Sequence, residues 1–347
     1  MTLSLWDWQD DEAARLRREG KVDLARLWEQ FEHIVGDQGA LKAAAERARE
    51  LDEPRFELLF WHWYVQQGLF RLFANPQSFE TAATRLEALA ADARCAGIAQ
   101  HLCARESLYH LKQATDAPGH AEETLRLAES LAGQVPRALD CRGCFELLRI
   151  QSLLALGRAE DAAPLVETFS RGDHDDNQRL LALLFAAEIA EQRDQAARME
   201  GHLEQAETLA RDGTVNADNA WYVLELRVRC DLLGGDPGRA ERRFAAAPPR
   251  PPEASMEAIR TELALARGWA EAGDSATSRG HAEAAAGRGL RRGLVRLAAE
   301  GTLLAAEACQ ALGDTEGAAA HAGTLGTLLP QLRSRDLDER ARVVGAV

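Results

Sequence analysis

Cys141 and Cys144 form the only arrangement in this chain with a precedent for reactive chemistry, two thiols three positions apart at the expected start of a helix. The positive end of a helix dipole favours the thiolate form of a cysteine there. A redox role also needs an adjoining βαβ fold, and a zinc site needs a second pair of ligands at a matched spacing. The sequence offers neither, so we expect buried structural cysteines, with a metal or thiol-redox protein as a lesser alternative.

Two other groups of residues have types that could do chemistry. His101, Cys103 and His110 share one expected helix, but no neighbouring segment offers the remaining ligands of a metal site. Glu188 and Glu191 are three positions apart on a helix, close enough to pair as acid and base, yet this spacing is common on any solvated helix face. We therefore expect no catalytic residue, no metal site and no cofactor, and we predict that the protein is not an enzyme.

The composition favours helices and limits the kinds of partner. The 347 residues are 46% hydrophobic and only 6% aromatic, and the formal net charge is -14, which argues against a nucleic-acid binder. The amino terminus lacks the pattern of a signal peptide, and no stretch of 18 apolar residues occurs. Six cysteines at irregular spacings do not indicate a disulfide framework. We expect a cytoplasmic protein with no membrane partner.

The elements that position these residues follow a pattern that recurs eight times. Its anchors are 37 to 42 residues apart, at Gly36, Gln77, Gly119, Gly157, Asp194, Gly235, Gly273 and Gly313. The residues five, nine and twelve positions after each anchor are small or apolar, and these offsets lie on one helical stripe. A period near 40 residues indicates a stack of helix-turn-helix units, each packing on its neighbours.

Each unit is expected to contain a helix A, a turn at the anchor and a helix B that carries the apolar stripe. The expected A helices span residues 55–73, 99–115, 145–156, 177–193, 219–233, 256–272 and 294–312. Further helices are expected at 4–18 and 24–35. Four prolines in residues 247–252 make a stiff spacer, where the array has a possible bend.

The residues Gly235, Asp236 and Ala240, followed by Phe244 and Ala247, resemble the second helix of the tetratricopeptide-repeat family. The chain looks like a divergent member with repeats of about 40 residues. The resemblance implies an all-α fold, an α-solenoid with a right-handed superhelix of about eight TPR-like repeats. It also implies three parts, an N-terminal leader and capping helix at 1–22, the repeat array at 23–335, and a C-terminal tail or capping helix at 336–347.

In that family helix A lines the concave surface, where partner segments bind. The residue six positions before each anchor is polar in all eight units, which predicts a solvated stripe on helix A; its members are Gln30, Arg71, Gln113, Gln151, Glu188, Arg229, Arg267 and Glu307. The predicted partner-binding residues are the glutamine and arginine members of this stripe, together with nearby tyrosine, glutamine, glutamate and arginine side chains. They are Gln30, Tyr64, Gln67, Arg71, Tyr109, Gln113, Gln151, Tyr222, Glu225, Arg229, Arg260 and Arg267.

This pattern predicts a non-catalytic scaffold that binds another protein or a peptide segment. It disfavours a small-molecule substrate. The alternative is a peptide-responsive regulatory receptor of the bacterial TPR signalling type, in which a small peptide changes the grip on a second protein.

The amino-terminal end differs from the rest in its aromatic content. Twelve of the 20 aromatic residues lie before residue 81, among them Trp6, Trp8, Trp28 and Phe31. Terminal units of a solenoid must close an exposed apolar face, so a packed cap would explain the surplus. An aromatic platform that binds a partner is the alternative.

Overall fold

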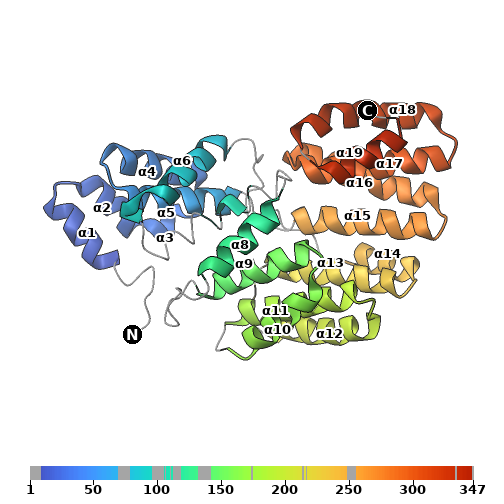
Figure 1. Cartoon of the computed structure of the whole chain (residues 1–347), viewed down its shortest axis with the longest axis horizontal. Coiled ribbons are helices and arrows are strands. Elements are labelled where there is room, and N and C mark those ends of the chain that lie inside the picture. Colours follow the sequence, from blue (N-terminus) through green and yellow to red (C-terminus); the bar gives the residue numbers. More distant parts are fainter. Residues whose placement is uncertain are drawn as a thin grey trace. The chain divides into compact units, whose positions relative to one another are not determined.

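The computed structural model is helical and contains no strand in the residues that it describes (Figure 1). These are residues 9–68, 79–95, 105, 107–109, 111, 119–131, 142–172, 175–212, 215, 217–247, 255–332 and 334–345. The predicted all-α class is confirmed for this part of the chain. No helix within these ranges is both long enough and apolar enough to cross a bilayer.

Contacts divide the chain into two compact units, which are described separately below. The first unit consists of Met1–Gln113 and His120–Ser152, and the second consists of Ala114–Gly119 and Leu153–Val347.

The described helices of the first unit follow the expected order. They are α1 (Gln9–Arg18), α2 (Val22–Glu29), α3 (Phe31–Ile34), α4 (Gln38–Glu50), α5 (Pro54–Gln66), α6 (Glu80–Ala91), the short 3-10 helix η3 (Ala93–Cys95), α8 (His120–Leu131) and the larger part of α9 (Arg142–Ala155). The single helix expected at 24–35 is wrong, because the chain breaks at Gln30 between α2 and α3.

Aromatic rings form the core of this unit. Trp28 and Phe31 pack with Phe56 and Phe60 of α5, and all four are buried. The ring centroids of Trp28 and Phe56 are 5.2 Å apart in an edge-on arrangement, which aromatic pairs prefer. The described aromatic residues here are therefore mostly interior, as a packed cap requires, while Trp6 and Trp8 lie outside the described residues.

The second unit alternates longer helices in an A-then-B order. Its elements are α10 (Ala159–Ser170), α11 (Asp176–Gln192), α12 (Ala196–Asp212), α13 (Ala217–Leu233), α14 (Pro237–Ala245), α15 (Ser255–Glu271), α16 (Ser275–Arg292), α17 (Val295–Ala311), α18 (Thr315–Leu328), the 3-10 helix η5 (Leu329–Gln331) and α19 (Arg335–Val343). Helices α11, α13, α15 and α17 are the expected A helices, and each bound agrees with its prediction within two residues.

The anchors of this unit are the turns between helix A and helix B. Gly235 and Gly313 adopt left-handed backbone conformations with φ of 77° and 74°, which end helix A. The next residue caps helix B: a carboxylate oxygen of Asp314 accepts a hydrogen bond from the Gly317 amide at 2.8 Å. Asp194 adopts the same conformation at φ 56° without being glycine, so the predicted register holds there as well.

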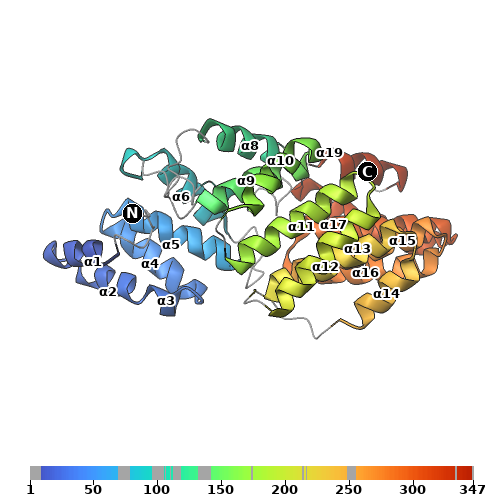
Figure 2. The same ribbon diagram turned by 90° about the horizontal axis from the view of Figure 1, so that it is seen from below.

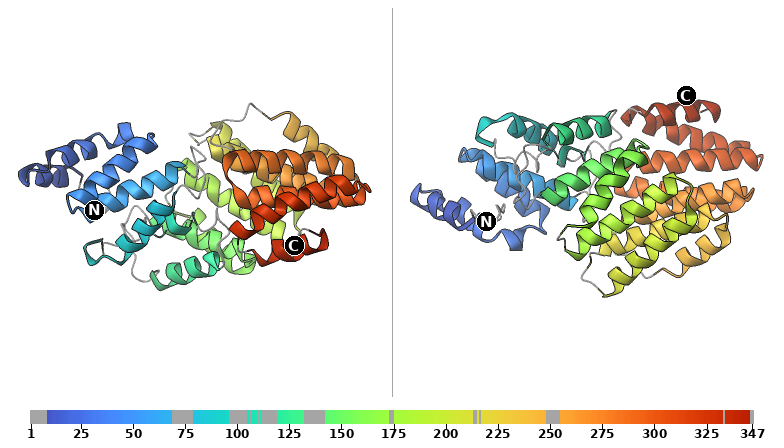
Figure 3. Two further views of the ribbon diagram at one scale, coloured as in Figure 1. Left: turned by 90° about the horizontal axis from the view of Figure 1, so that it is seen from above. Right: turned by 60° about the horizontal axis from the view of Figure 1, so that its bottom comes forward.

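The predicted apolar stripe of helix B is the face that packs. Nearly all described members of the stripe are buried, and the exceptions, Phe244, Ala247 and Ala322, are half-buried. Phe169 is 2% exposed, whereas Phe244 is only half-buried and packs on Trp221 of α13 and Ala258 of α15. Core clusters join an A helix, its B helix and the next A helix, as in α11 with α12 and α13, or α15 with α16 and α17. Figures 2 and 3 show the course of these helices as ribbons.

The A helices of the second unit form a closely spaced row. Helix α11 contacts α13, α13 contacts α15, and α15 contacts α17, whereas the described B helices show no comparably extensive contact with one another. Long side chains reach between neighbouring B helices instead, as in the contact of 2.6 Å between His281 Nε2 of α16 and Glu241 Oε2 of α14. The side chains of the A row therefore meet directly across neighbouring repeats.

Candidate partner-binding face

In the first unit, the predicted partner-binding residues differ widely in exposure. Gln30 is exposed between α2 and α3, and Tyr64 is half-buried, with its ring 5.3 Å from that of Trp61. Gln67 and Tyr109 are buried, at 3% and 2% exposure, so their side chains belong to the packed interior. Burial also raises the pKa of Tyr64, with a smaller contribution from Glu46. The part that these residues take in binding stays a prediction, and Arg71 and Gln113 lie outside the described residues.

In the second unit, the structure brings four of the predicted residues together. Tyr222, Glu225 and Arg229 lie on α13, one turn apart, and Arg260 reaches them from α15. Glu188 and Glu191 complete the group from α11. We call these six residues the Glu225 cluster. Gln151 is half-buried on α9 and belongs to the first unit.

Arg229 holds the Glu225 cluster together across two repeats. Its Nε donates to Glu191 Oε1 at 2.9 Å, and its Nη2 donates to the other oxygen of Glu191. Its Nη1 lies 3.2 Å from Glu225 Oε1 and 3.5 Å from Glu188 Oε1. A guanidinium presents donors in a fixed fork, which suits such bidentate binding of carboxylates. Burial by itself would lower the pKa of Arg229, but Glu225, Glu191 and Glu188 together raise it.

Two groups of the cluster are costly to ionise because they are removed from water. Burial raises the pKa of Glu225, and the nearby Arg260 and Arg229 only partly oppose this shift. Burial also raises the pKa of Tyr222 well above its usual value, and Glu188 and Glu225 add to the effect. The cluster is thus a half-buried polar network on the A row.

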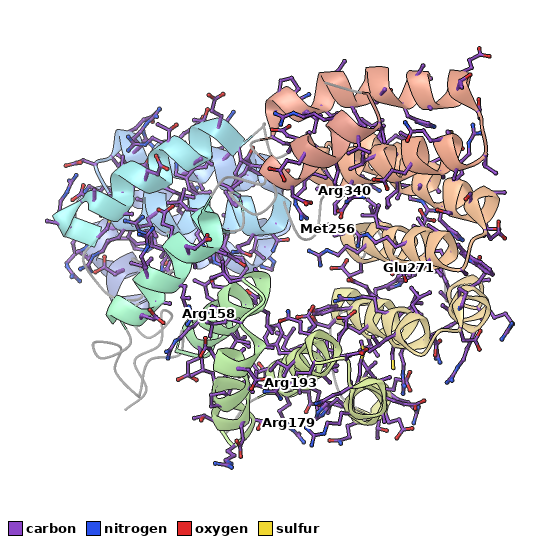
Figure 4. All side chains as sticks on the ribbon, turned by 45° about the vertical axis from the view of Figure 1, so that its right-hand side comes forward. Arg158, Arg179, Arg193, Met256, Glu271 and Arg340 are labelled. Carbon is purple, nitrogen blue, oxygen red and sulfur yellow. The ribbon has the colours of Figure 1, made fainter. Side chains whose placement is uncertain are left out.

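Ion pairs continue along the A row beyond the Glu225 cluster. Arg267 of α15 is exposed and pairs with Glu300 of α17. Glu307 of α17 lies 3.0 Å from Arg340 of α19, which Figure 4 labels. At the other end, Arg193 closes α11 against α10 by donating to both oxygens of Glu160, at 2.8 and 2.7 Å. The described members of the predicted stripe are all exposed or half-buried, so its solvated character is confirmed for them.

Sequence reasoning missed the way these charges pair. It treated Arg229 and Arg267 as groups available to a partner, whereas the structure places carboxylates against both. Glu300 and Arg340 were not singled out at all. A signal was present, because Glu188 and Arg229 occupy the same offset before successive anchors and carry opposite charges. Equivalent positions of adjacent repeats lie side by side, so opposite signs there predict a pair.

The thiols that the structure describes have no reactive environment. Cys95, Cys230 and Cys309 are free and buried. Burial raises the pKa of all three, to about 11 for Cys95, which disfavours the thiolate. The described residues include no group of three or more His, Cys, Asp or Glu side chains placed to hold a metal ion. Cys141, His101, Cys103 and His110 lie outside the described residues, and so does the side chain of Cys144.

A shallow pocket in the first unit is lined largely by ion-paired side chains. Arg85 donates to both oxygens of the buried Glu57, at 2.7 and 2.8 Å, and Arg94 lies 2.8 Å from Asp52. Acidic and basic side chains alternate around it, so its charges are largely satisfied from within.

No protein-family model matches this sequence, and no curated protein matches it. Function is therefore inferred from the geometry alone. What the geometry offers is a row of polar side chains on successive A helices, with hydrogen-bond donors, acceptors and one buried carboxylate in reach of each other. These side chains come from three successive A helices, α11, α13 and α15.

Proposed function

We propose that this protein is a tetratricopeptide-like α-solenoid that binds a segment of another protein, or a peptide, along its A helices without catalysing a reaction. The observation that carries the proposal is the contact of Glu188 with Arg229, two members of the stripe in adjacent repeats, 3.5 Å apart. Polar residues that recur in the sequence and meet across neighbouring repeats offer a surface on which an extended segment can lie.

The division of labour between the two helices of each repeat supports this proposal. The apolar stripe of helix B packs against neighbouring helices, and its members Met199, Leu203 and Ala206 are completely buried. The A helices lie closer to one another than the B helices do, which is the spacing expected if they line the inner side of a curved array. A partner bound there would meet the ion-paired row and exchange some of these internal pairs for its own contacts.

Selection from a random-peptide library on the purified protein tests the proposal and needs no candidate partner. The face variant is Arg267→Ala with Glu300→Ala, an ion pair between α15 and α17. The matched control is Arg171→Ala with Glu167→Ala, an exposed ion pair at the end of α10. We expect selected peptides to bind the face variant at least tenfold more weakly than the parent, because hot-spot truncations cost about 2 kcal/mol or more.

Equal binding of the selected peptides by the parent and the face variant would contradict the proposal. The same peptides also separate it from the receptor alternative. A receptor should change its radius of gyration in solution scattering when a bound peptide is added, whereas a passive scaffold should keep the same value.

A further inference from the structure

The Glu225 carboxylate is a buried charged group of the A row with one unsatisfied oxygen. Its side chain is 3% exposed, and Oε1 accepts a hydrogen bond from Arg229 Nη1 at 3.2 Å. The other oxygen, Oε2, is buried and has no hydrogen-bond partner. A buried carboxylate oxygen that accepts no hydrogen bond from the protein is costly, because burial is not offset by a donor at that oxygen.

The guanidinium of Arg260 faces this oxygen at a longer distance. Arg260 Nη1 lies 4.0 Å from Glu225 Oε2, beyond hydrogen-bond distance, and this is the one ion pair of Arg260 in the described part of the chain. The side chain of Arg260 is 34% exposed, so it has room to turn toward solvent. Arg229 differs sharply, since three carboxylates bind it. One guanidinium of the cluster is hydrogen-bonded to carboxylates, and the other makes only a longer contact with one of them.

The charge balance of the Glu225 cluster also favours a further cation. Three carboxylates, those of Glu188, Glu191 and Glu225, share the two guanidiniums of Arg229 and Arg260. A cation that enters the cluster would therefore meet an unsatisfied acceptor in a half-buried site whose carboxylates outnumber its guanidiniums, where Coulomb attraction is stronger than in water.

We propose that the Glu225 cluster is a subsite for one arginine side chain of the bound segment. The incoming guanidinium takes the place of the Arg260 head group and donates to Glu225 Oε2, while Arg260 swings outward. A guanidinium fits better than an ammonium, because its planar fork can bond a carboxylate with two donors and is more weakly hydrated. The inference rests on the proposed function, since it names the chemistry that the A row recognises.

A rescue experiment with a small cation tests the subsite without any peptide. In Arg260→Ala, ethylguanidinium chloride at millimolar concentration should raise the melting temperature above that measured with equal sodium chloride, because the cation fills the position that the side chain has left. The double variant Arg260→Ala with Glu225→Gln should show no such rise. The control Arg171→Ala, which removes an exposed arginine, should show none either. Equal behaviour of Arg260→Ala and the double variant would overturn the proposal.

The selected peptides give the second test. They should share one arginine whose replacement by citrulline, a neutral group of the same shape, weakens binding to the parent about 30-fold. In Glu225→Gln, replacing the peptide arginine by citrulline should have little effect on binding. The control is Glu207→Gln on α12, which alters the partner of Arg227 on α13. In this control, citrulline should still weaken binding about 30-fold.

The two proposals can fail separately. Peptides that lose affinity for the face variant yet bind equally well with citrulline would sink the arginine subsite and leave the binding face in place. A lysine accepted as well as arginine would overturn the guanidinium selectivity. Peptides indifferent to the face variant would remove the proposed function, and the ethylguanidinium rescue would then decide the subsite by itself.

Discussion

The two units pack their helices in different ways, the first around large aromatic rings and the second through close contacts at glycine. In the first unit, Trp28, Phe56 and Phe60 fill the space between α2 and α5 with large rings. In the second unit, α16 and α17 approach so closely that a Cβ added to Gly301 would stand 2.7 Å from the backbone nitrogen of Ala286. A Cβ added to Gly289 would likewise lie 2.8 Å from the backbone nitrogen of Ala298.

The difference shows two ways to fill the space between packed helices. Small residues allow helix backbones to meet directly, as in α16 and α17. Large rings fill the wider space between helices that stand further apart, as in α2 and α5. Buried aromatic rings fill the core of the first unit, whereas Gly289 and Gly301 allow the backbones of α16 and α17 to approach closely.

The largest effect should follow from emptying the aromatic core. Phe60→Ala should destabilise the first unit by about 3 to 5 kcal/mol, because Phe60 is fully buried and the cavity cannot close completely. Trp63→Ala is the matched control, since Trp63 is only half-buried and should cost less. Chemical denaturation followed by circular dichroism measures both. A similar loss for the two variants would show that burial does not set the difference.

A medium effect should follow from adding one methyl group to the close contact of α16 and α17. Gly301→Ala should destabilise the second unit by about 1 to 3 kcal/mol, because the atoms in its way are backbone and cannot move aside. Gly280→Ala, on the open side of α16, should instead stabilise by up to about 1 kcal/mol through helix propensity. Thermal denaturation of both variants checks the opposite signs, and two stabilising changes would refute the close contact.

A smaller effect should appear at the turn that lacks glycine. Asp194→Gly should stabilise by about 1 kcal/mol, because Asp194 holds a left-handed conformation that disfavours a side chain. Gly235→Ala should destabilise by a similar amount at the equivalent turn. The pair is measured by urea denaturation. A loss of stability in Asp194→Gly would mean that the aspartate contributes more than its backbone strain costs.

The smallest effect should be a pH dependence of the helix caps in the second unit. Hydrogen bonds from the Gly317 amide and then Arg279 lower the pKa of Asp314, and those from Thr277 lower the pKa of Asp274. A lowered pKa in the folded state means that the stabilisation is present above the unfolded pKa and is lost as the pH falls through the folded value.

Asparagine keeps a capping oxygen without a titrating charge. Asp274→Asn with Asp314→Asn should therefore lose less melting temperature than the parent between pH 7 and pH 3. An equal loss in both proteins would show that these caps do not contribute to the pH dependence. In the first unit, Phe79 occupies the N-cap position of α6 and provides no side-chain cap, so this helix start has no cap of the same kind to titrate.

Much of the fold could be predicted because the signal repeats. The A helices expected at 177–193 and 256–272 occur as α11 and α15, displaced by a single residue, and the turn at Asp194 keeps its register without a glycine. The helix expected at 24–35 failed for the opposite reason. It occurs once, at a terminus, where no second copy of the pattern could reveal the break at Gln30.

The candidate site was predicted as a surface and not as a network. Polar residues six positions before each anchor showed that helix A has a solvated stripe, and Arg229 and Arg267 lie on it. The ion pairs of Arg229 with Glu191 and of Arg267 with Glu300 could not be predicted, because pairing depends on the distance and offset between neighbouring A helices. The burial of Gln67 and Tyr109 likewise depends on how the helices pack, and the polar character of these side chains gave no indication of it.

The amino-acid sequence by itself determined the helical class, the repeat length and the face that each helix B buries, since periodicity and turn chemistry act within one short segment. Only the tertiary structure decided which charges meet, why α16 and α17 need glycine, and that one oxygen of Glu225 is left without a hydrogen bond. Those features depend on distances of a few ångströms between different helices, and the stacking of the helices, not a local pattern, sets such distances.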